Sequence, residues 1–211
     1  MASQDPRTLA VLASGRGSNF EALARAAQSG ALPGRIRVLL CDRADAPALQ
    51  RAGALGIEAL CPPTGVRRTR LDDETPWIEA LQARGVGTVL LAGFMRRLHA
   101  PFLDAFANRI LNVHPSLLPA FPGLDAIGQS WRAGVKITGV TVHMVTAALD
   151  EGPILAQEAV VVRDDDTAEA LEARVHAVEH RLYPAAVRQF LDAPWHLEGR
   201  RMVFDAGAPR V

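Results

Sequence analysis

Two polar side chains stand two residues apart at the end of an apolar run, Asn112 and His114. If this run is a strand, residues i and i+2 point to the same side, so an amide donor lies beside an imidazole. Such a pair can stabilise a developing oxyanion while the histidine carries a proton. A lone histidine in a strand is more often structural. Here, however, the segment Pro115-Ser116-Leu117-Leu118-Pro119 follows it, which indicates a rigid loop in which Leu118–Pro119 could be cis.

A glycine-rich turn, Ser14-Gly15-Arg16-Gly17-Ser18-Asn19, separates an expected strand from an expected helix. Open α/β sheets bind ligands at the carboxyl ends of their strands, and a helix start offers N–H groups to an anion. Ser18 and Asn19 could add side-chain donors, and either could also cap the helix. We therefore expect an anion site at this turn, with a plain capped turn as the alternative.

The same turn allows a second interpretation, a dinucleotide-binding fingerprint. Gly15 and Gly17 match its first two glycines, and Asp42 ends the second strand, where a ribose-binding carboxylate would lie. Phe20 occupies the third glycine position, and a bulky side chain there argues against a nicotinamide cofactor.

A carboxylate that could serve His114 lies in the segment Leu149-Asp150-Glu151-Gly152-Pro153. If Asp150 lay near the imidazole, its charge would favour the protonated ring. The alternative is an ordinary turn acid, because Asp and Gly are common in turns.

Metal ligation finds little support in the pattern of histidines. His176 and His180 are spaced i, i+4 on an expected helix, which could hold zinc, but no cysteine or third ligand completes a set. We expect a solvated helix face there and no metal.

The elements that must position these residues follow from apolar periodicity. In the first half, short apolar runs alternate with helical patterns, which predicts parallel strands covered on both faces. The expected strands span residues 8–14, 35–41, 56–60 and 88–92, and the expected helices span 18–28, 46–54 and 70–84.

From residue 110 the pattern changes. A strand ends at 112–114, a helix covers about 125–133, two strands at 137–145 and 153–162 could pair antiparallel, and a long helix covers 167–191. The sequence thus predicts an α/β fold with one Rossmann-like open sheet, mostly parallel, with an antiparallel C-terminal addition and helices on both faces. We expect one domain over residues 1–211, with a phosphate-binding half at about 8–100, a catalytic region at about 91–155, and a frayed tail at about 204–211.

Composition is that of an ordinary folded protein. Of the 211 residues, 49% are hydrophobic, and 23 Lys and Arg balance 23 Asp and Glu, which argues against a protein that coats nucleic acid. No apolar run approaches the length that spans a membrane, and no signal peptide precedes the first strand. Cys41 and Cys61 are too few for a disulfide framework and are expected to be free thiols, so we expect a cytoplasmic protein.

Seven blocks in order give the chain a strong resemblance to the phosphoribosylglycinamide formyltransferases, the folate-dependent enzymes of purine biosynthesis, from about residue 9 to 191. They are Ser14-Gly15-x-Gly17-Ser18-Asn19, Leu91-Ala92-Gly93-Phe94-Met95-Arg96, Asn112-x-His114-Pro115-Ser116-Leu117-Leu118-Pro119, Phe121-Pro122-Gly123-Leu124, Gly139-x-Thr141-Val142-His143, Leu149-Asp150-x-Gly152-Pro153 and Glu179-His180.

The resemblance implies a reaction and a set of site residues. The glycinamide amine would attack the formyl carbon of the co-substrate 10-formyltetrahydrofolate directly, without a metal; the protein would act as a monomer or homodimer. The implied catalytic residues are Asn112, His114 and Asp150, and the implied phosphate-binding residues are Gly17, Ser18 and Asn19. The sugar and glycinamide end would contact His176, Ala177, Val178 and Glu179, and the folate would contact Arg70, Met95, Arg96, Arg97, Leu98, Asn112, Thr146, Ala147, Ala148, Leu149 and Asp150.

The chain departs from the family pattern at Asp125, where the family usually carries histidine, and at Ile127, where some members carry histidine. A carboxylate at 125 could alter the electrostatics near the phosphate, but it leaves the catalytic trio intact. Lower-ranked alternatives are a formyltetrahydrofolate hydrolase and a methionyl-tRNA formyltransferase, for whose additional domains the sequence leaves no room. A nicotinamide-dependent oxidoreductase and a non-catalytic sugar-phosphate sensor rank lower still.

Overall fold

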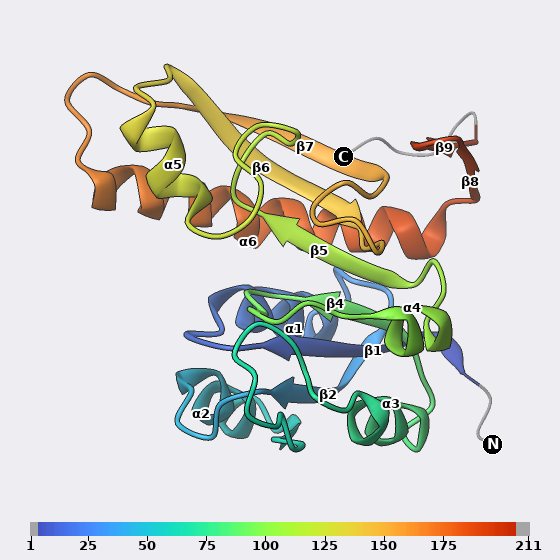
Figure 1. The fold of residues 1–211 in the computed structure, drawn as a ribbon. Coiled ribbons are helices and arrows are strands. Elements are labelled where there is room, and N and C mark those ends of the chain that lie inside the picture. Colours follow the sequence, from blue (N-terminus) through green and yellow to red (C-terminus); the bar gives the residue numbers. More distant parts are fainter. Residues whose placement is uncertain (1–3, 206–211) are drawn as a thin grey trace. The chain divides into compact units, whose positions relative to one another are not determined.

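Buried apolar runs build a parallel sheet in the first of two units into which the chain divides, Met1–Leu111 and Asn112–Val211. The computed structural model describes residues 4–205. Strand β1 (Asp5–Ala13) lies between the parallel strands β2 (Arg35–Cys41) and β4 (Val86–Leu91) (Figure 1). Strand β3 (Glu58–Leu60) pairs with β2, also parallel. Residues 9–13 of β1 are fully buried, as expected of a central parallel strand.

The elements of the first unit alternate in type along the chain. The strands are β1 (Asp5–Ala13), β2 (Arg35–Cys41), β3 (Glu58–Leu60) and β4 (Val86–Leu91). The helices are α1 (Ser18–Gln28), α2 (Pro47–Ala54), α3 (Thr75–Gln82) and α4 (Ala100–Ala105).

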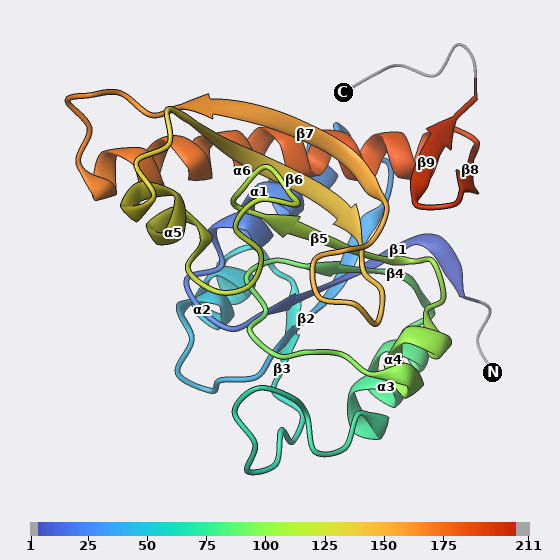
Figure 2. The same cartoon turned by 45° about the horizontal axis from the view of Figure 1, so that its top comes forward.

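The second unit is built on an antiparallel pair. Strands β6 (Ile137–Met144) and β7 (Ile154–Val161) pair antiparallel, and β9 (Arg201–Phe204) joins the edge of β7. The long helix α6 (Ala168–Asp192) packs along β6 and β7 (Figure 2). The strands are β6 (Ile137–Met144), β7 (Ile154–Val161), β8 (Trp195–Glu198) and β9 (Arg201–Phe204), and the helices are α5 (Ala126–Arg132) and α6 (Ala168–Asp192). Strand β5 (Ile110–His114) crosses the division between the units.

The expected fold class is confirmed: the protein is α/β, with an open sheet that is mostly parallel and has antiparallel strands in its C-terminal part. Helix α1 and strand β2 have the expected bounds, and the expected antiparallel pair is β6 with β7. The Leu118–Pro119 peptide bond is cis.

One helix is shorter than expected. The pattern over residues 70–84 predicts a helix, but α3 begins only at Thr75, so the prediction is wrong for residues 70–74. Pro76 lies in the first turn, where its missing N–H leaves no helical hydrogen bond unmade. Arg70 instead forms a parallel bridge with Arg97.

Helix α4 has no counterpart among the expected elements. It has six residues, of which only Phe102 is buried, too short a stretch for a helical period to be recognised. A distant side chain stabilises its start: the buried Glu74 carboxylate accepts the His99 N–H at 2.8 Å and the Phe102 N–H at 3.1 Å. The Phe102 N–H also donates to the His99 carbonyl at 3.1 Å, so Glu74 adds a second acceptor at the first turn of α4, where no i→i−4 partner exists.

Strands β8 and β9 were also not expected. They form an antiparallel hairpin that includes Gly199, with φ 62°. Phe204, at the start of the expected frayed tail, ends β9, and the remaining residues from 206 lie outside the described range.

The Glu74 cap makes a prediction for stability. Glu74→Gln puts an NH2 group where a carboxylate oxygen accepts an N–H, so the free energy of unfolding should fall by about 1–3 kcal/mol in urea denaturation. Glu79→Gln, the same change at an exposed position of α3, should stay within about 0.5 kcal/mol. Equal losses in the two variants would contradict the capping role.

Candidate active site

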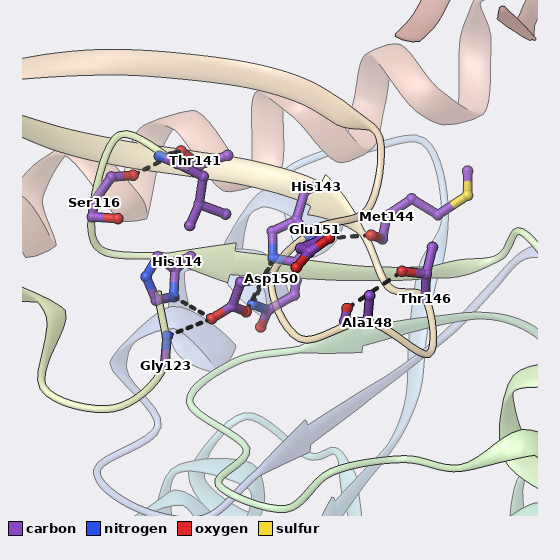
Figure 3. A network of polar contacts seen from close by, with 12 residues as sticks. His114, Ser116, Gly123, Thr141, His143, Met144, Thr146, Ala148, Asp150 and Glu151 are labelled. Carbon is purple, nitrogen blue, oxygen red and sulfur yellow. Dashed lines mark hydrogen bonds and ion pairs between the residues drawn. The ribbon is translucent and has the colours of Figure 1, made fainter. Parts of the chain in front are cut away.

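His114 ends β5 with its ring buried between two oxygen atoms. Its Nε2 donates to the Phe121 carbonyl at 2.9 Å, and its Nδ1 lies 3.6 Å from Asp150 Oδ2 (Figure 3). In the neutral ring the hydrogen bond to the carbonyl places the proton on Nε2. Nδ1 is therefore the atom that can take up a further proton, and it faces a carboxylate that is 9% exposed.

The backbone of the β6–β7 loop places the Asp150 carboxylate. Asp150 has a left-handed φ of 54°, and its Oδ2 accepts the Gly123 N–H at 2.7 Å. At Gly152 a Cβ atom would lie 1.8 Å from the Met144 carbonyl oxygen, so only glycine fits where the loop returns to β7. Left-handed backbone at a residue other than glycine, as at Asp150, concentrates at functional sites.

His143, on β6, joins Asn112 to this cluster. Its Nδ1 donates to the Met144 carbonyl at 3.0 Å, which leaves Nε2 as an acceptor for Asn112 Nδ2 at 3.1 Å. Nε2 also lies 3.7 Å from Asp150 Oδ1. Burial lowers the pKa of His143, so the neutral ring that accepts from Asn112 is favoured.

His143 is a site residue that sequence reasoning did not assign, because a histidine inside a fully buried strand looks like a core residue. The structure thus brings together Asn112, His114 and Asp150 as expected, through a fourth side chain. Asn112 Nδ2 keeps a second N–H, so the cluster offers an oriented amide donor beside an imidazole that can gain a proton.

The loop after β5 is fastened to β6 and β7. Thr141 Oγ1 donates to the Ser116 carbonyl at 2.7 Å and accepts the Leu118 N–H at 3.1 Å, while Gln157 Nε2 donates to the Leu118 carbonyl at 2.9 Å. Phe121, with φ 54°, turns its carbonyl towards His114. The rigid loop expected from its prolines therefore owes its shape to hydrogen bonds as well.

In the first unit, the glycine-rich turn rests on α2. Gly17, with φ 75°, is the N-cap of α1, which has no side-chain cap, so neither Ser18 nor Asn19 caps it. A Cβ atom at Gly17 would lie 2.7 Å from the Ala48 Cβ. Glycine is therefore required both by the backbone conformation and by the contact with α2.

Two carbonyl groups of this turn are bound from α2. The Gly15 carbonyl accepts the Ala48 N–H at 3.2 Å, and the Arg16 carbonyl accepts Arg51 Nε at 2.9 Å. In a planar trans peptide the C=O and N–H point in opposite directions, so these bonds turn the N–H groups of Arg16 and Gly17 away from α2. Arg51 also pairs with Glu21, whose other oxygen accepts from Arg25.

Arg96, expected to contact folate, uses its guanidinium within the protein. Nε donates to Asp42 at 2.7 Å, with the two side chains 11% and 6% exposed, and Nη1 donates to the carbonyls of Arg67 and Arg70. Asp42 is thereby engaged in an ion pair, which weakens the interpretation of it as a ribose ligand. Of the other expected folate contacts in this unit, Arg70, Met95 and Arg97 are exposed and Leu98 is buried.

The expected folate contacts of the second unit precede Asp150. Thr146, Ala147, Ala148 and Leu149 are exposed, and Leu149 is a large apolar side chain with 48% of its surface accessible. The exposed stretch ends at the buried carboxylate of the cluster described above.

On α6, the expected sugar-binding residues form a hydrogen-bonded set. His176 Nδ1 lies 2.7 Å from an oxygen of the buried Glu179, and Nε2 lies 3.1 Å from Glu172. His176 is 25% exposed, so the expected solvated face is only partly realised. Ala177 is exposed and Val178 buried. Within residues 4–205, no group of three or more His, Cys, Asp and Glu side chains could hold a metal ion.

Asp125, which departs from the family pattern, is paired locally. It lies before α5 with a left-handed φ of 57°, and its Oδ2 accepts Arg132 Nη2 at 2.9 Å. Both side chains are more than half exposed, so solvent screens the added charge.

The lowered pKa of His143 predicts a dependence of stability on pH. The unfolded chain takes up a proton near the ordinary value of 6.5, whereas the folded chain does so only at lower pH. The free energy of unfolding should therefore fall as pH drops below 6.5, by at most about 1.4 kcal/mol per pH unit from this group. Urea denaturation between pH 7.5 and 5 should show a smaller loss in His143→Gln than in the wild type. His196→Gln, at an exposed position, serves as control; equal slopes in all three proteins would contradict the assignment.

Comparison with known proteins identifies the family of the chain. The formyl transferase family model matches residues 7–187. The chain is 41% identical to the phosphoribosylglycinamide formyltransferase of Bacillus subtilis over 88% of this chain and 95% of that protein, and 36% identical to that of Escherichia coli over 92% and 95%. The crystal structure of glycinamide ribonucleotide transformylase 1 from Symbiobacterium toebii matches with a TM-score of 0.89 at 48% identity, covering 93% of each chain. The chain therefore belongs to the formyl transferase family and, within it, to the phosphoribosylglycinamide formyltransferases.

Proposed function

We propose that this protein transfers the formyl group of 10-formyltetrahydrofolate to the amine of glycinamide ribonucleotide, a step of purine biosynthesis. The observation that carries the proposal is the cluster of contacting side chains Asn112, His114, His143 and Asp150, in a chain of this family. The cluster supplies an oriented amide donor and a proton-accepting imidazole, the two groups that attack on a formyl carbon requires.

In the proposed reaction the substrate amine attacks the formyl carbon directly, and a tetrahedral intermediate forms with negative charge on the former carbonyl oxygen. Asn112 Nδ2 donates its second N–H to this oxygen, and protonated His114 adds positive charge nearby. The attacking amine loses a proton and the leaving folate nitrogen gains one, by way of His114 or an ordered water. No covalent intermediate with the enzyme is needed, because holding two reactants in place can itself remove roughly 7–11 kcal/mol of barrier.

Gly17, Ser18 and Asn19 hold the substrate phosphate in this proposal. The support is the turn's geometry: N–H groups directed away from α2 at the start of α1. Glu179 and His176, with the neighbouring Ala177 and Val178, receive the sugar and glycinamide end, where a buried carboxylate can accept from hydroxyl or amine groups.

The folate contacts follow the same reasoning. Two sets of residues are proposed to bind the folate. The first unit contributes Arg70, Met95, Arg96, Arg97 and Leu98, and the β6–β7 loop contributes residues 146–150. Because the Arg96 guanidinium is bound to Asp42 and to two carbonyls, its backbone rather than its charge is the group available to a ligand.

The direct test is an assay of formyl transfer to glycinamide ribonucleotide, followed by the absorbance of the tetrahydrofolate product. Product formed only when glycinamide ribonucleotide is present supports transfer. Equal release without this acceptor would instead support the hydrolase alternative, and binding of NADH in a fluorescence titration would support an oxidoreductase.

His114→Ala should lower kcat by about 10²–10⁴-fold in this assay, because the proton-carrying ring is lost. Folate binding, measured by calorimetry, should stay within a few-fold of the wild type. Near-normal turnover in a folded variant would remove His114 from the reaction.

Asp150→Asn keeps an oxygen for the Gly123 N–H but removes the negative charge that faces His114. The protonated ring is then less favoured, so kcat should fall and the alkaline limb of its pH profile should move to lower pH. An unchanged profile would exclude coupling between the two side chains.

Arg51→Ala releases the Arg16 carbonyl of the glycine-rich turn. We expect KM for glycinamide ribonucleotide to rise roughly tenfold with kcat little changed, the effect of losing one charged hydrogen bond. Arg25→Ala is the matched control, since it removes one positive charge and the other partner of Glu21 but leaves the turn untouched. A similar rise in both variants would assign the effect to charge and not to the orientation of the turn.

A further inference from the structure

Two thiols lie at the carboxyl ends of neighbouring strands of the first unit. Cys41 is the buried last residue of β2, and Cys61 is the exposed residue directly after β3. The parallel register pairs Leu40 with Leu60, so the two cysteines occupy the next pair of positions. Adjacent strands lie about 4.8 Å apart, within the Cα separations of about 4.4–6.8 Å that a disulfide spans.

The two side chains also point to the same place. The Arg43 carbonyl oxygen lies 3.3 Å from the Cys41 sulfur and 3.9 Å from the Cys61 sulfur. Two sulfurs that contact one oxygen atom lie on the same side of the two strands. The pair therefore differs from two cysteines that are merely close in the fold.

The two thiols differ in their exposure to solvent. Only Cys61 can be reached by a molecule from solvent, because Cys41 has no accessible surface. Burial raises the pKa of both thiols, and Cys61 contributes to the rise at Cys41. At neutral pH both are mainly protonated, so reaction is slow and should accelerate as pH rises.

We propose that Cys41 and Cys61 form a self-resolving thiol pair that closes to an internal disulfide when it meets a small-molecule disulfide. The Cys61 thiolate attacks one sulfur of that molecule and expels the other half as a thiolate, leaving a mixed disulfide at Cys61. Cys41 then loses its proton to solvent, attacks the Cys61 sulfur and expels the second half. The protein loses two hydrogens and two electrons, and the small disulfide is reduced to two thiols.

An internal Cys41–Cys61 disulfide would prevent a bulky adduct from remaining at Cys61. Cys61 begins the segment whose carbonyls at Arg67 and Arg70 bind Arg96, and Arg96 pairs with Asp42, the residue between Cys41 and Arg43. If the small molecule is oxidised glutathione, a mixed disulfide left at Cys61 would place a tripeptide beside this buried ion pair. An internal disulfide would join positions that already lie side by side.

The test is intact-mass spectrometry of the full chain after incubation with oxidised glutathione at pH 8. Wild-type protein should lose the mass of two hydrogens without accumulating an adduct, and dithiothreitol should restore the original mass. Cys41→Ser should instead accumulate one glutathione at Cys61, and Cys61→Ser should not react. Cys41→Ala provides a second variant with an apolar side chain, and thermal melts check that each variant is folded.

Two results would overturn the proposal. One is a glutathione adduct that persists on wild-type protein to the same extent as on Cys41→Ser. The other is wild-type protein that keeps two free thiols when folded but forms the disulfide after unfolding in urea. Neither readout depends on the enzymatic activity proposed above.

Discussion

The Asp150 carboxylate is the group on which the arrangement of the proposed catalytic cluster depends. One oxygen accepts the Gly123 N–H and faces His114, while the other faces His143. The carboxylate is 9% exposed, and each of its oxygens therefore lies close to one imidazole with little solvent between them. Its position rests in turn on the left-handed backbone at Asp150 and on the absence of a side chain at Gly152.

Two imidazoles near one carboxylate do not share the positive charge equally. His143 uses Nδ1–H for the Met144 carbonyl and needs an unprotonated Nε2 to accept from Asn112, and burial lowers its pKa further. A charge on His114 also acts against a charge on His143. The neutral His143 ring can therefore accept from the Asn112 amide, which leaves the second N–H of that amide for a ligand.

The sequence predicted those helices and strands whose bounds depend on apolar periodicity within the segment itself. Apolar periodicity placed α1 and β2 at their observed bounds, and strand geometry placed Asn112 and His114 on one side. The start of α3 and the whole of α4 were not predictable in this way, because Glu74 stabilises them through a contact between distant segments. Asp150 could be named only from its motif, since nothing in the spacing shows that it meets His114. The sequence did not indicate a role for His143, because its contact with Asn112 joins two strands that are distant in sequence.

The net charge of zero does not show which contacts individual arginine side chains make. Arg51, Arg96 and Arg174 each pair with a carboxylate, so they exert little field on an approaching anion, yet each also binds a backbone carbonyl. A carbonyl held on one side turns the N–H of the same peptide to the other side. In the glycine-rich turn this favours recognition of an anion by amide N–H groups rather than by a free positive side chain. An anion site of this kind, as proposed for the turn, cannot be recognised from a count of charges.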